Sequence, residues 1–158
     1  MLQEEDHYYM GLALDEARKS FSEGEVPVGA LIVSKGEVFG RGRNRVEKEC
    51  DPTSHAEMVA IREATSHIES WRLSGATLYV TLEPCTMCIG AIVLARIERL
   101  VFGCFDPKSG AVGSLYNIAA EERLNHKVLV TSGVRAAECS GMLKRFFKEL
   151  RDTRKSCR

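Results

Sequence analysis

The sequence predicts an α/β fold in which helices cover the faces of a partly parallel sheet. The chain has 158 residues, the size of one domain. Hydrophobic residues make up 44% and charged residues 28%, as in a globular protein. In the second half of the chain, short apolar runs alternate with segments of helical periodicity, and this alternation favours parallel strand pairs. We expect a single domain over residues 1–158, with its core over about 6–150.

The first half of the chain predicts a helix, a hairpin and a second helix. Apolar residues recur at helical spacing between residues 7 and 22. Ser34-Lys35-Gly36 is typical of a tight turn and separates two runs of strand length. A loop over 51–54 leads into the next helix. The elements expected here are a helix over 7–22, strands over 26–33 and 37–44, and a helix over 55–68.

The second half predicts three more strands and two more helices. Pro84 suits the first turn of a helix. In open α/β sheets the chemistry usually lies at strand ends, where helices begin, and two motifs of this chain fall at such positions. The elements expected here are strands over 76–82, 99–105 and 127–131, and helices over 85–96 and 134–153.

Charge is balanced over the whole chain but not along it. The 22 basic and 22 acidic residues give a net charge of zero, which does not by itself indicate a nucleic-acid partner. Residues 144–158 carry seven basic and two acidic side chains, a net charge of +5. This helix and tail over 134–158 is either a phosphate-binding surface or an ordinary solvated helix face.

The N-terminus and the apolar runs bear on location. No run approaches the roughly 20 apolar residues of a membrane span. The first six residues are acidic, unlike a signal peptide. We expect a cytoplasmic protein without a membrane partner, in which cysteines bind metal or stay free.

Two short motifs predict a zinc site. Cys85 and Cys88 are three residues apart, which places both sulfurs on one face at the start of a helix. The helix dipole favours the thiolate form that binds zinc. His55 adds a third ligand, and three protein ligands leave a position for water. Zinc lowers the pKa of such a water to about 7, and Glu57 is the carboxylate placed to move its protons.

Each motif alone has an ordinary interpretation. A lone C-x-x-C pair is also found in redox proteins, although no thioredoxin-like context surrounds this one. Ser54 followed three residues later by Glu57 fits a capping box, which would give Glu57 a structural task. His55 and Glu57 are two apart and do not share a face of a regular helix. Together, however, the motifs match the H-x-E…P-C-x-x-C signature of zinc deaminases that act on bases.

The chain also resembles a known family over residues 6–150. It is similar to the bacterial tRNA-specific adenosine deaminases, within the cytidine-deaminase-like superfamily. The segment over 106–115 and the pair Phe146-Phe147 point to the tRNA enzymes more narrowly than the zinc motif does. The segments that carry the resemblance are 25–30, 42–45, 51–57, 76–85, 101–103, 106–115, 125–126 and 146–147.

The resemblance implies a three-layer cytidine-deaminase-like fold, with a five-stranded mixed sheet flanked by helices. It implies one Zn²⁺ per subunit, a homodimer, and an active site completed near the dimer interface. The implied reaction is hydrolysis of adenosine to inosine at the wobble position of tRNA(Arg). The implied partner is therefore a tRNA anticodon stem-loop, whose unpaired bases proteins read by stacking and base-edge hydrogen bonds.

The resemblance also assigns roles to single residues. Glu57 is catalytic, and His55, Cys85 and Cys88 hold the metal. Asn44 contacts the flipped nucleotide, while Val28 and Ala56 border its base. Asp106 and Lys108 meet the neighbouring nucleotides, and Phe147 holds the splayed loop together with Arg145 and Arg151. Ordinary interpretations stay open, since Asn44 and Asp106 also suit turns, and only one of Phe146 and Phe147 is expected to face RNA.

Two rival functions remain at this point. The first is a deaminase of a free base or nucleoside, such as cytosine, cytidine or guanine, on the same fold. The second is a non-catalytic zinc-containing RNA-binding protein. The segment over 106–115 and the basic C-terminus weigh against the first, and Glu57 with a three-ligand site weighs against the second.

Overall fold

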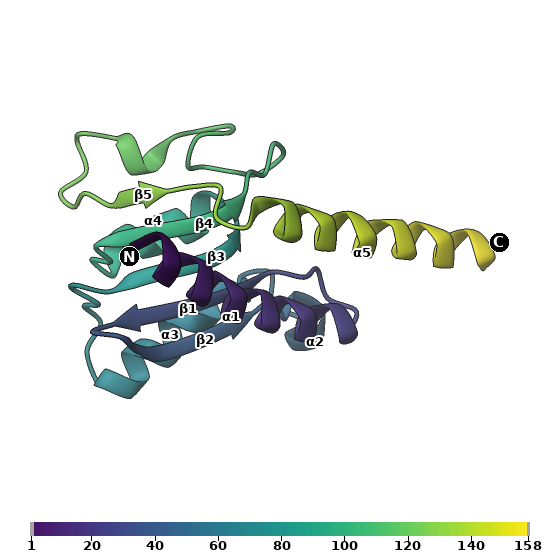
Figure 1. Ribbon diagram of the computed structural model, residues 1–158, viewed down its shortest axis with the longest axis horizontal. Helices are drawn as coiled ribbons and strands as arrows, with labels where there is room; N and C mark the ends of the chain where they lie inside the picture. Colours follow the sequence, from purple (N-terminus) through teal and green to yellow (C-terminus); the bar gives the residue numbers. More distant parts are fainter. Residues whose placement is uncertain (1, 158) are drawn as a thin grey trace.

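A computed structural model describes residues 2–157 and has a five-stranded mixed sheet at its centre (Figure 1). The strand order is β2-β1-β3-β4-β5. The strands are β1 (Gly29–Ser34), β2 (Glu37–Arg43), β3 (Thr77–Leu82), β4 (Arg99–Cys104) and β5 (Leu129–Thr131). The helices are α1 (Leu2–Ser22), α2 (Val46–Glu49), α3 (Ala56–Ile68), α4 (Thr86–Leu94), the 3₁₀ turn η1 (Ile118–Ala120) and α5 (Ala136–Ser156).

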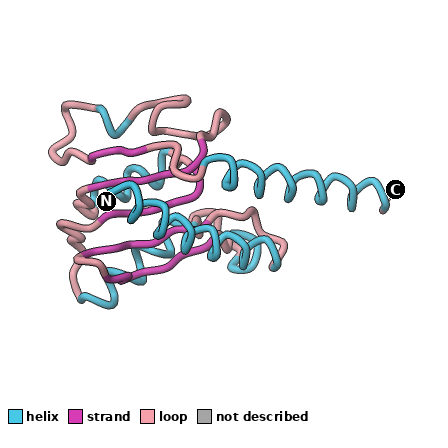
Figure 2. Tube along the Cα trace, in the orientation of Figure 1, coloured by secondary structure: helices cyan, strands magenta, loops and turns pink. Residues whose placement is uncertain are grey.

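The sheet is antiparallel on one side and parallel on the other. Strand β1 pairs antiparallel with β2 and β3, while β3–β4 and β4–β5 are parallel pairs. Lys35 and Gly36 both have positive φ, as the predicted hairpin turn between β1 and β2 requires. Helix α4 connects the parallel strands β3 and β4, so it begins at the carboxyl end of β3. This crossover (Figure 2) delivers one metal-binding motif to the edge where ligands bind in such sheets.

Helices cover both faces of the sheet and give the three layers that the resemblance implied. Along β3, Leu78 and Val80 face one core while Tyr79 faces the other, as the two-residue period of a strand demands. Helices α3 and α4 pack on the first face. Helices α1 and α5 pack on the second face, which is turned toward the viewer in Figure 1.

Helix α3 lies unusually close to β2. A Cβ atom on Gly42 would collide with the backbone carbonyl of Ala56, and one on Gly40 would collide with that of Ala60. Glycine is therefore required at both positions for steric reasons. The close packing sets the position of the first turn of α3, which carries His55 and Glu57.

The elements differ from the sequence prediction mainly at their ends. Helix α1 begins at Leu2 and α5 runs to Ser156, beyond the predicted 7–22 and 134–153. Helices α2 and η1 were not predicted, because both are too short to show periodicity. The last turns of α5 extend away from the sheet and are exposed (Figure 1). Arg158, counted in the basic segment, lies outside the described residues.

Within residues 2–157, no helix combines the length and the apolar character that spanning a bilayer requires.

Candidate active site

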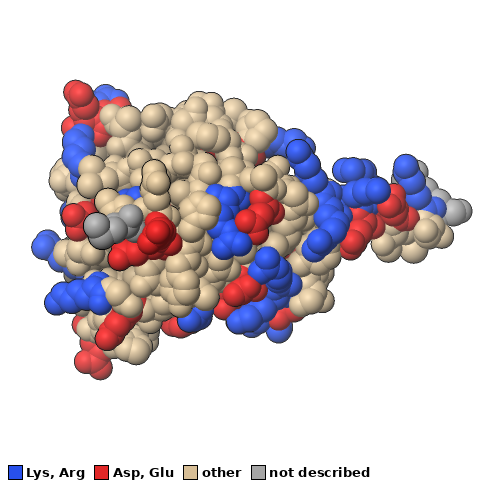
Figure 3. Space-filling view, in the orientation of Figure 1, with Lys and Arg blue, Asp and Glu red and all other residues tan. Residues whose placement is uncertain are grey.

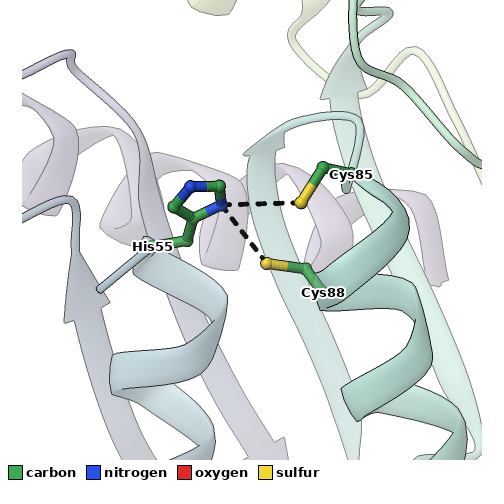
Figure 4. Close-up of side chains that lie close together, drawn as sticks. All are labelled: His55, Cys85 and Cys88. Carbon is green, nitrogen blue, oxygen red and sulfur yellow. Dashed lines mark hydrogen bonds between the residues drawn. The ribbon is translucent and has the colours of Figure 1, made fainter. Parts of the chain in front are cut away.

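Three ligand side chains from two helix starts meet in one place (Figure 4). The ligand atoms of His55, Cys85 and Cys88 lie within 4.8 Å of one another. His55 Nδ1 is 3.6 Å from Cys85 Sγ and 3.5 Å from Cys88 Sγ. One imidazole nitrogen and two sulfurs at this separation form a donor set that suits the tetrahedral geometry of zinc. The structure thus brings together the three predicted ligands.

Both helix starts use their cap residue as a ligand. His55 is the N-cap of α3 and Cys85 the N-cap of α4, each with an extended backbone. Because His55 precedes the helix, its side chain is not bound to the helical spacing that separates residues two apart. His55 and Glu57 can therefore approach one metal ion. The positive ends of both helices point toward the site and stabilise the thiolates that zinc needs.

The two cysteines shift each other's pKa in opposite directions. The pKa of Cys85 falls to about 4, chiefly because of its hydrogen bond with the Cys88 thiol and further because of His55. The hydrogen bond to Cys85, together with burial, raises the pKa of Cys88. Zinc binding displaces a thiol proton, so the affinity of this site for metal depends on pH.

Glu57 is buried beside the ligands. It is the second residue of α3, and its exposed fraction is 4%. Burial raises the pKa of Glu57 and outweighs the opposing influence of His55 and Cys88. A raised pKa makes a carboxylate a stronger proton acceptor, and its position beside the ligands allows it to pass the proton on. This is the property that general acid–base catalysis requires.

Ser54 does not form the capping box that the sequence allowed. Its hydroxyl donates to Glu49 Oε2 at 2.5 Å, and Asp51 Oδ2 is a more distant alternative acceptor at 3.3 Å. The N-cap of α3 is His55, one residue later, and it makes no side-chain capping bond. The capping interpretation of Glu57 is therefore wrong, and its carboxyl group is free for the site.

A cavity of about 610 Å³ opens beside the ligands. Five of the proposed substrate-binding residues line it: Val28, Asn44, Ala56, Asp106 and Phe147. The Asn44 side chain donates to the carbonyl of Val26 and accepts from the amide of Val46, so neighbouring backbone fixes its orientation. This volume lies within the range of small-molecule sites but exceeds what one base fills.

Three other predicted residues lie outside the cavity wall. Lys108 and Arg151 are exposed. The Arg145 guanidinium lies over the Phe21 ring, 4.7 Å from its centroid, on the side of α5 that faces α1. Of the two adjacent phenylalanines, Phe146 is 8% exposed and packs on Phe21, while Phe147 is 41% exposed. Both rings line the cavity, and Phe147 presents the larger exposed surface to a ligand.

The cavity also has wall residues that sequence reasoning missed. Leu150 and Arg154 follow Phe147 at helical spacing and line the wall with it. That spacing was a usable signal, but the predicted helix ended at 153, one residue before Arg154. Glu83 and Ser109 line the wall from the loops that follow β3 and β4. Their proximity depends on chain folding that no local pattern encodes.

Comparison with known proteins identifies the family of this chain. Residues 3–104, which include all three ligands and Glu57, match the cytidine and deoxycytidylate deaminase zinc-binding region. A tRNA-specific adenosine deaminase of Bacillus subtilis (strain 168) is 53% identical over 154 residues, covering 98% of this chain and 96% of the relative. The family match and the donor set together identify zinc as the metal.

Two solved structures share the fold. One comes from studies of A-to-I editing by tRNA:A34 deaminases at the wobble position of transfer RNA. Its TM-score is 0.83 and its identity 46%, and the match covers 86% of this chain and 99% of that one. The other, a guanine deaminase of Bacillus subtilis, has a TM-score of 0.60 and 35% identity, over 62% of this chain and 63% of its own. The chain belongs to the cytidine and deoxycytidylate deaminase family, and within it to the tRNA-specific adenosine deaminases.

Proposed function

We propose that this protein hydrolyses adenosine to inosine at the wobble position of tRNA(Arg). The observation that carries the proposal is a buried Glu57, with a raised pKa, beside a His-Cys-Cys ligand set at the end of an open cavity. A structural zinc site normally closes with four protein ligands, whereas this set supplies three. The arrangement therefore favours a catalytic centre over a non-catalytic zinc protein.

In the proposed chemistry, Glu57 carries out both proton transfers. Zinc held by His55, Cys85 and Cys88 would lower the pKa of a water to about 7 and so make it available for attack. As the water oxygen bonds to C6 of adenine, Glu57 accepts a water proton and passes it to N1. Glu57 then takes the remaining hydroxyl proton and gives it to the amino group as the C6–N bond breaks. Adenosine and water thus become inosine and ammonia.

The cavity wall is proposed to select a nucleotide within an RNA loop. Val28 and Ala56 border the base, and Asn44 contacts the flipped nucleotide, because amide side chains both donate and accept hydrogen bonds. Asp106 and Phe147 line the outer part, where neighbouring nucleotides of a splayed loop would lie. Proteins read such unpaired bases by stacking on aromatic rings. A single free base would leave much of the 610 Å³ empty.

The basic side chains of helix α5 are proposed to bind phosphates of the tRNA outside the cavity. Lys144, Lys148, Arg151 and Lys155 are exposed and follow one another by four, three and four residues, so they share one side of the helix. Figure 3 shows Lys and Arg side chains along the protruding part of α5. Such cations bind phosphates despite a net charge of zero. Lys108 is proposed to act from the rim, and Arg145 through its charge alone.

The partner and the location complete the proposal. The proposed partner is the anticodon stem-loop, and the proposed location is the cytoplasm, which a tRNA substrate supports. We also propose a homodimer formed over the end of α4, where Leu94 is 69% exposed and nearby Trp71 is 60% exposed. The two positions are neighbours because the amide of Leu73 donates to the carbonyl of Ala95. Large exposed apolar side chains that cluster in this way mark interaction sites.

Guanine deamination is the second candidate, because a guanine deaminase shares 35% identity over part of the chain. The deciding experiment measures ammonia released by the zinc-loaded protein. The substrates are the anticodon stem-loop of tRNA(Arg) and free guanine, cytosine, cytidine and adenosine. Release from the stem-loop alone supports the proposal. Release from a free base or nucleoside alone would contradict it and support the rival.

A further inference from the structure

Glu83 is a buried carboxylate whose hydrogen-bond donors all come from one loop. It follows β3 directly, two residues before the ligand Cys85, and its exposed fraction is 2%. The backbone amides of Asp106, Val112 and Ser114 donate to it at 2.9, 2.9 and 3.0 Å. The hydroxyl of Ser114 is a fourth donor. Among residues 2–157, no salt bridge to Glu83 is found, so backbone amides take the place of a cation.

The four bonds use both carboxylate oxygens. Oε1 accepts from Asp106 and from the Ser114 hydroxyl, while Oε2 accepts from the amides of Val112 and Ser114. Bonds to a charged acceptor are stronger than bonds between neutral groups. A glutamine here would present an NH₂ group to at least one backbone amide and leave that amide unpaired, since only the Ser114 hydroxyl can reverse and accept. The site therefore requires a carboxylate and not merely a polar side chain of the same length.

The loop wraps around Glu83 so closely that it needs a glycine. A Cβ atom on Gly110 would collide with the carboxylate of Glu83. Gly110 does not have positive φ, so the close approach alone excludes a larger residue. Two backbone interactions hold the same part of the loop against the start of α4. Gly110 forms a β-bridge with Cys85, and the amide of Ala111 donates to the carbonyl of Pro84.

The same loop supplies part of the cavity wall. Asp106 and Ser109 line the cavity on one side of the Glu83 contact, and Cys85 lines it on the other. We propose that Glu83 is a positioning residue that holds the loop over 106–114 against the start of α4, so that substrate nucleotides bind in register with the metal ligand. This inference rests on the proposed function for its substrate, but its structural part does not.

The kinetic test uses Glu83→Gln in the zinc-loaded protein with the anticodon stem-loop. We expect zinc content to stay at one per chain, KM to rise by about tenfold or more, and kcat to change much less, since loss of a bond to a charged group is the cause. Glu16→Gln is the matched control, because Glu16 is also buried but pairs with Lys19 on α1. Its KM should not change. An unchanged KM in Glu83→Gln, or loss of zinc and kcat at constant KM, would overturn the proposal.

A second variant reaches the same contact from the opposite side. Gly110→Ala should raise KM as Glu83→Gln does, because the new methyl group displaces the carboxylate. In a Glu83→Asp background the shorter side chain leaves room for the methyl group. The rise in KM caused by Gly110→Ala should therefore be several-fold smaller in that background than in the wild type. Such non-additivity is the mark of a direct contact. Additive effects of the two substitutions would overturn the inference.

Hydrogen exchange separates this inference from the substrate assignment. The amides of Asp106, Val112 and Ser114 should exchange slowly in the zinc-loaded protein and faster in Glu83→Gln. This readout needs no substrate. If the wild-type protein released no ammonia from the stem-loop, the proposed function would fail while the exchange result still decided the role of Glu83. Equal exchange in both proteins would overturn that role.

Discussion

Three buried acidic side chains show how surroundings decide the role of a carboxylate. Glu57 has few partners, so burial raises its pKa and suits it to proton transfer. Glu83 accepts four hydrogen bonds from one loop. Asp6 pairs with Arg99 and Tyr79. The sequence alone offers no means to distinguish them, because their partners are 23 to 93 residues away for the last two.

The metal ligands give the first prediction. Cys88→Ala should lose both zinc and turnover, because two protein ligands bind zinc much more weakly than three. Zinc content by atomic emission and ammonia release measure the two effects. Cys139→Ala is the matched control, since Cys139 is also buried but lies in the core between α1, α5 and the sheet. A Cys88→Ala protein with full zinc and full activity would contradict the ligand assignment.

Asp6 gives the second prediction, which concerns stability. Burial raises the pKa of Asp6, but hydrogen bonds from Arg99 and Tyr79 outweigh it and hold the pKa below its ordinary value. A lowered folded-state pKa means that the pair stabilises the fold above about pH 4 and that this contribution is lost as pH falls further. Asp6→Asn should therefore destabilise the protein by about 2 kcal/mol at pH 7, below the value for a fully buried pair because Arg99 reaches water.

Urea unfolding at pH 7 and at about pH 3 measures this difference. The gap between wild type and Asp6→Asn should shrink at the lower pH, because the unfolded chain takes up a proton at Asp6 more readily than the folded chain does. Asp15→Asn removes an exposed pair with Arg18 and should change stability by less than about 0.5 kcal/mol. A gap that is constant with pH would contradict the account of Asp6.

At the scale of elements, helix starts were the most informative part of the sequence. The pairing of His55 and Cys85 followed from two predicted helix starts at strand ends, and the structure confirms that they meet. The H-x-E and C-x-x-C spacings therefore predicted the site more accurately than periodicity predicted the ends of the helices and strands. The exact N-cap of α3 could not be predicted, because the sequence allows either Ser54 or His55 at that position. The hydrogen bond from the Ser54 hydroxyl to Glu49 removes Ser54 as a capping side chain.

Tertiary packing decided what sequence could not. The register that places Gly110 against Glu83 depends on a loop with no periodic pattern. The orientation of Arg145 toward Phe21 follows from how α5 lies on α1, which a helical wheel alone does not give.

Helix α5 gives the third prediction. Phe147→Ala should raise KM for the stem-loop by about 5- to 100-fold, the effect of losing one base stacked on an aromatic ring. The kcat at saturation should change less, because Phe147 lies away from the metal ligands. Tyr8→Ala is the control, since Tyr8 is an exposed aromatic on α1 with 62% exposure. Equal KM values for wild type and Phe147→Ala would contradict an RNA contact at α5.

At the scale of the whole molecule, the distribution of groups matters more than their totals. A net charge of zero conceals a basic α5 next to the cavity. Near the end of α4, Leu94 is exposed while its neighbours Val93 and Ala95 are buried, and the same helix begins at the ligands, so one helix connects the site to the proposed dimer surface. Function on this scale depends on where the chain places its charged and apolar side chains.

The dimer surface gives the fourth prediction. Leu94→Asp should convert a dimer into a folded monomer, because a charge at the centre of an apolar contact loses its hydration without a partner. Light scattering gives the mass, and thermal unfolding shows whether the monomer stays folded. Leu129→Asp on β5 has a similar exposure of 63% and should remain dimeric. A wild-type protein of monomer mass would contradict the proposed dimer.

The most direct test of the central claim is to sequence tRNA(Arg) after incubation with the zinc-loaded protein. Inosine is read as guanosine, so conversion at the wobble position is visible in one experiment. We predict conversion by the wild-type protein and a rate lower by at least about 100-fold for Glu57→Gln, which should keep its zinc. Conversion at an unchanged rate in Glu57→Gln, or none by the zinc-loaded wild type, would contradict the account.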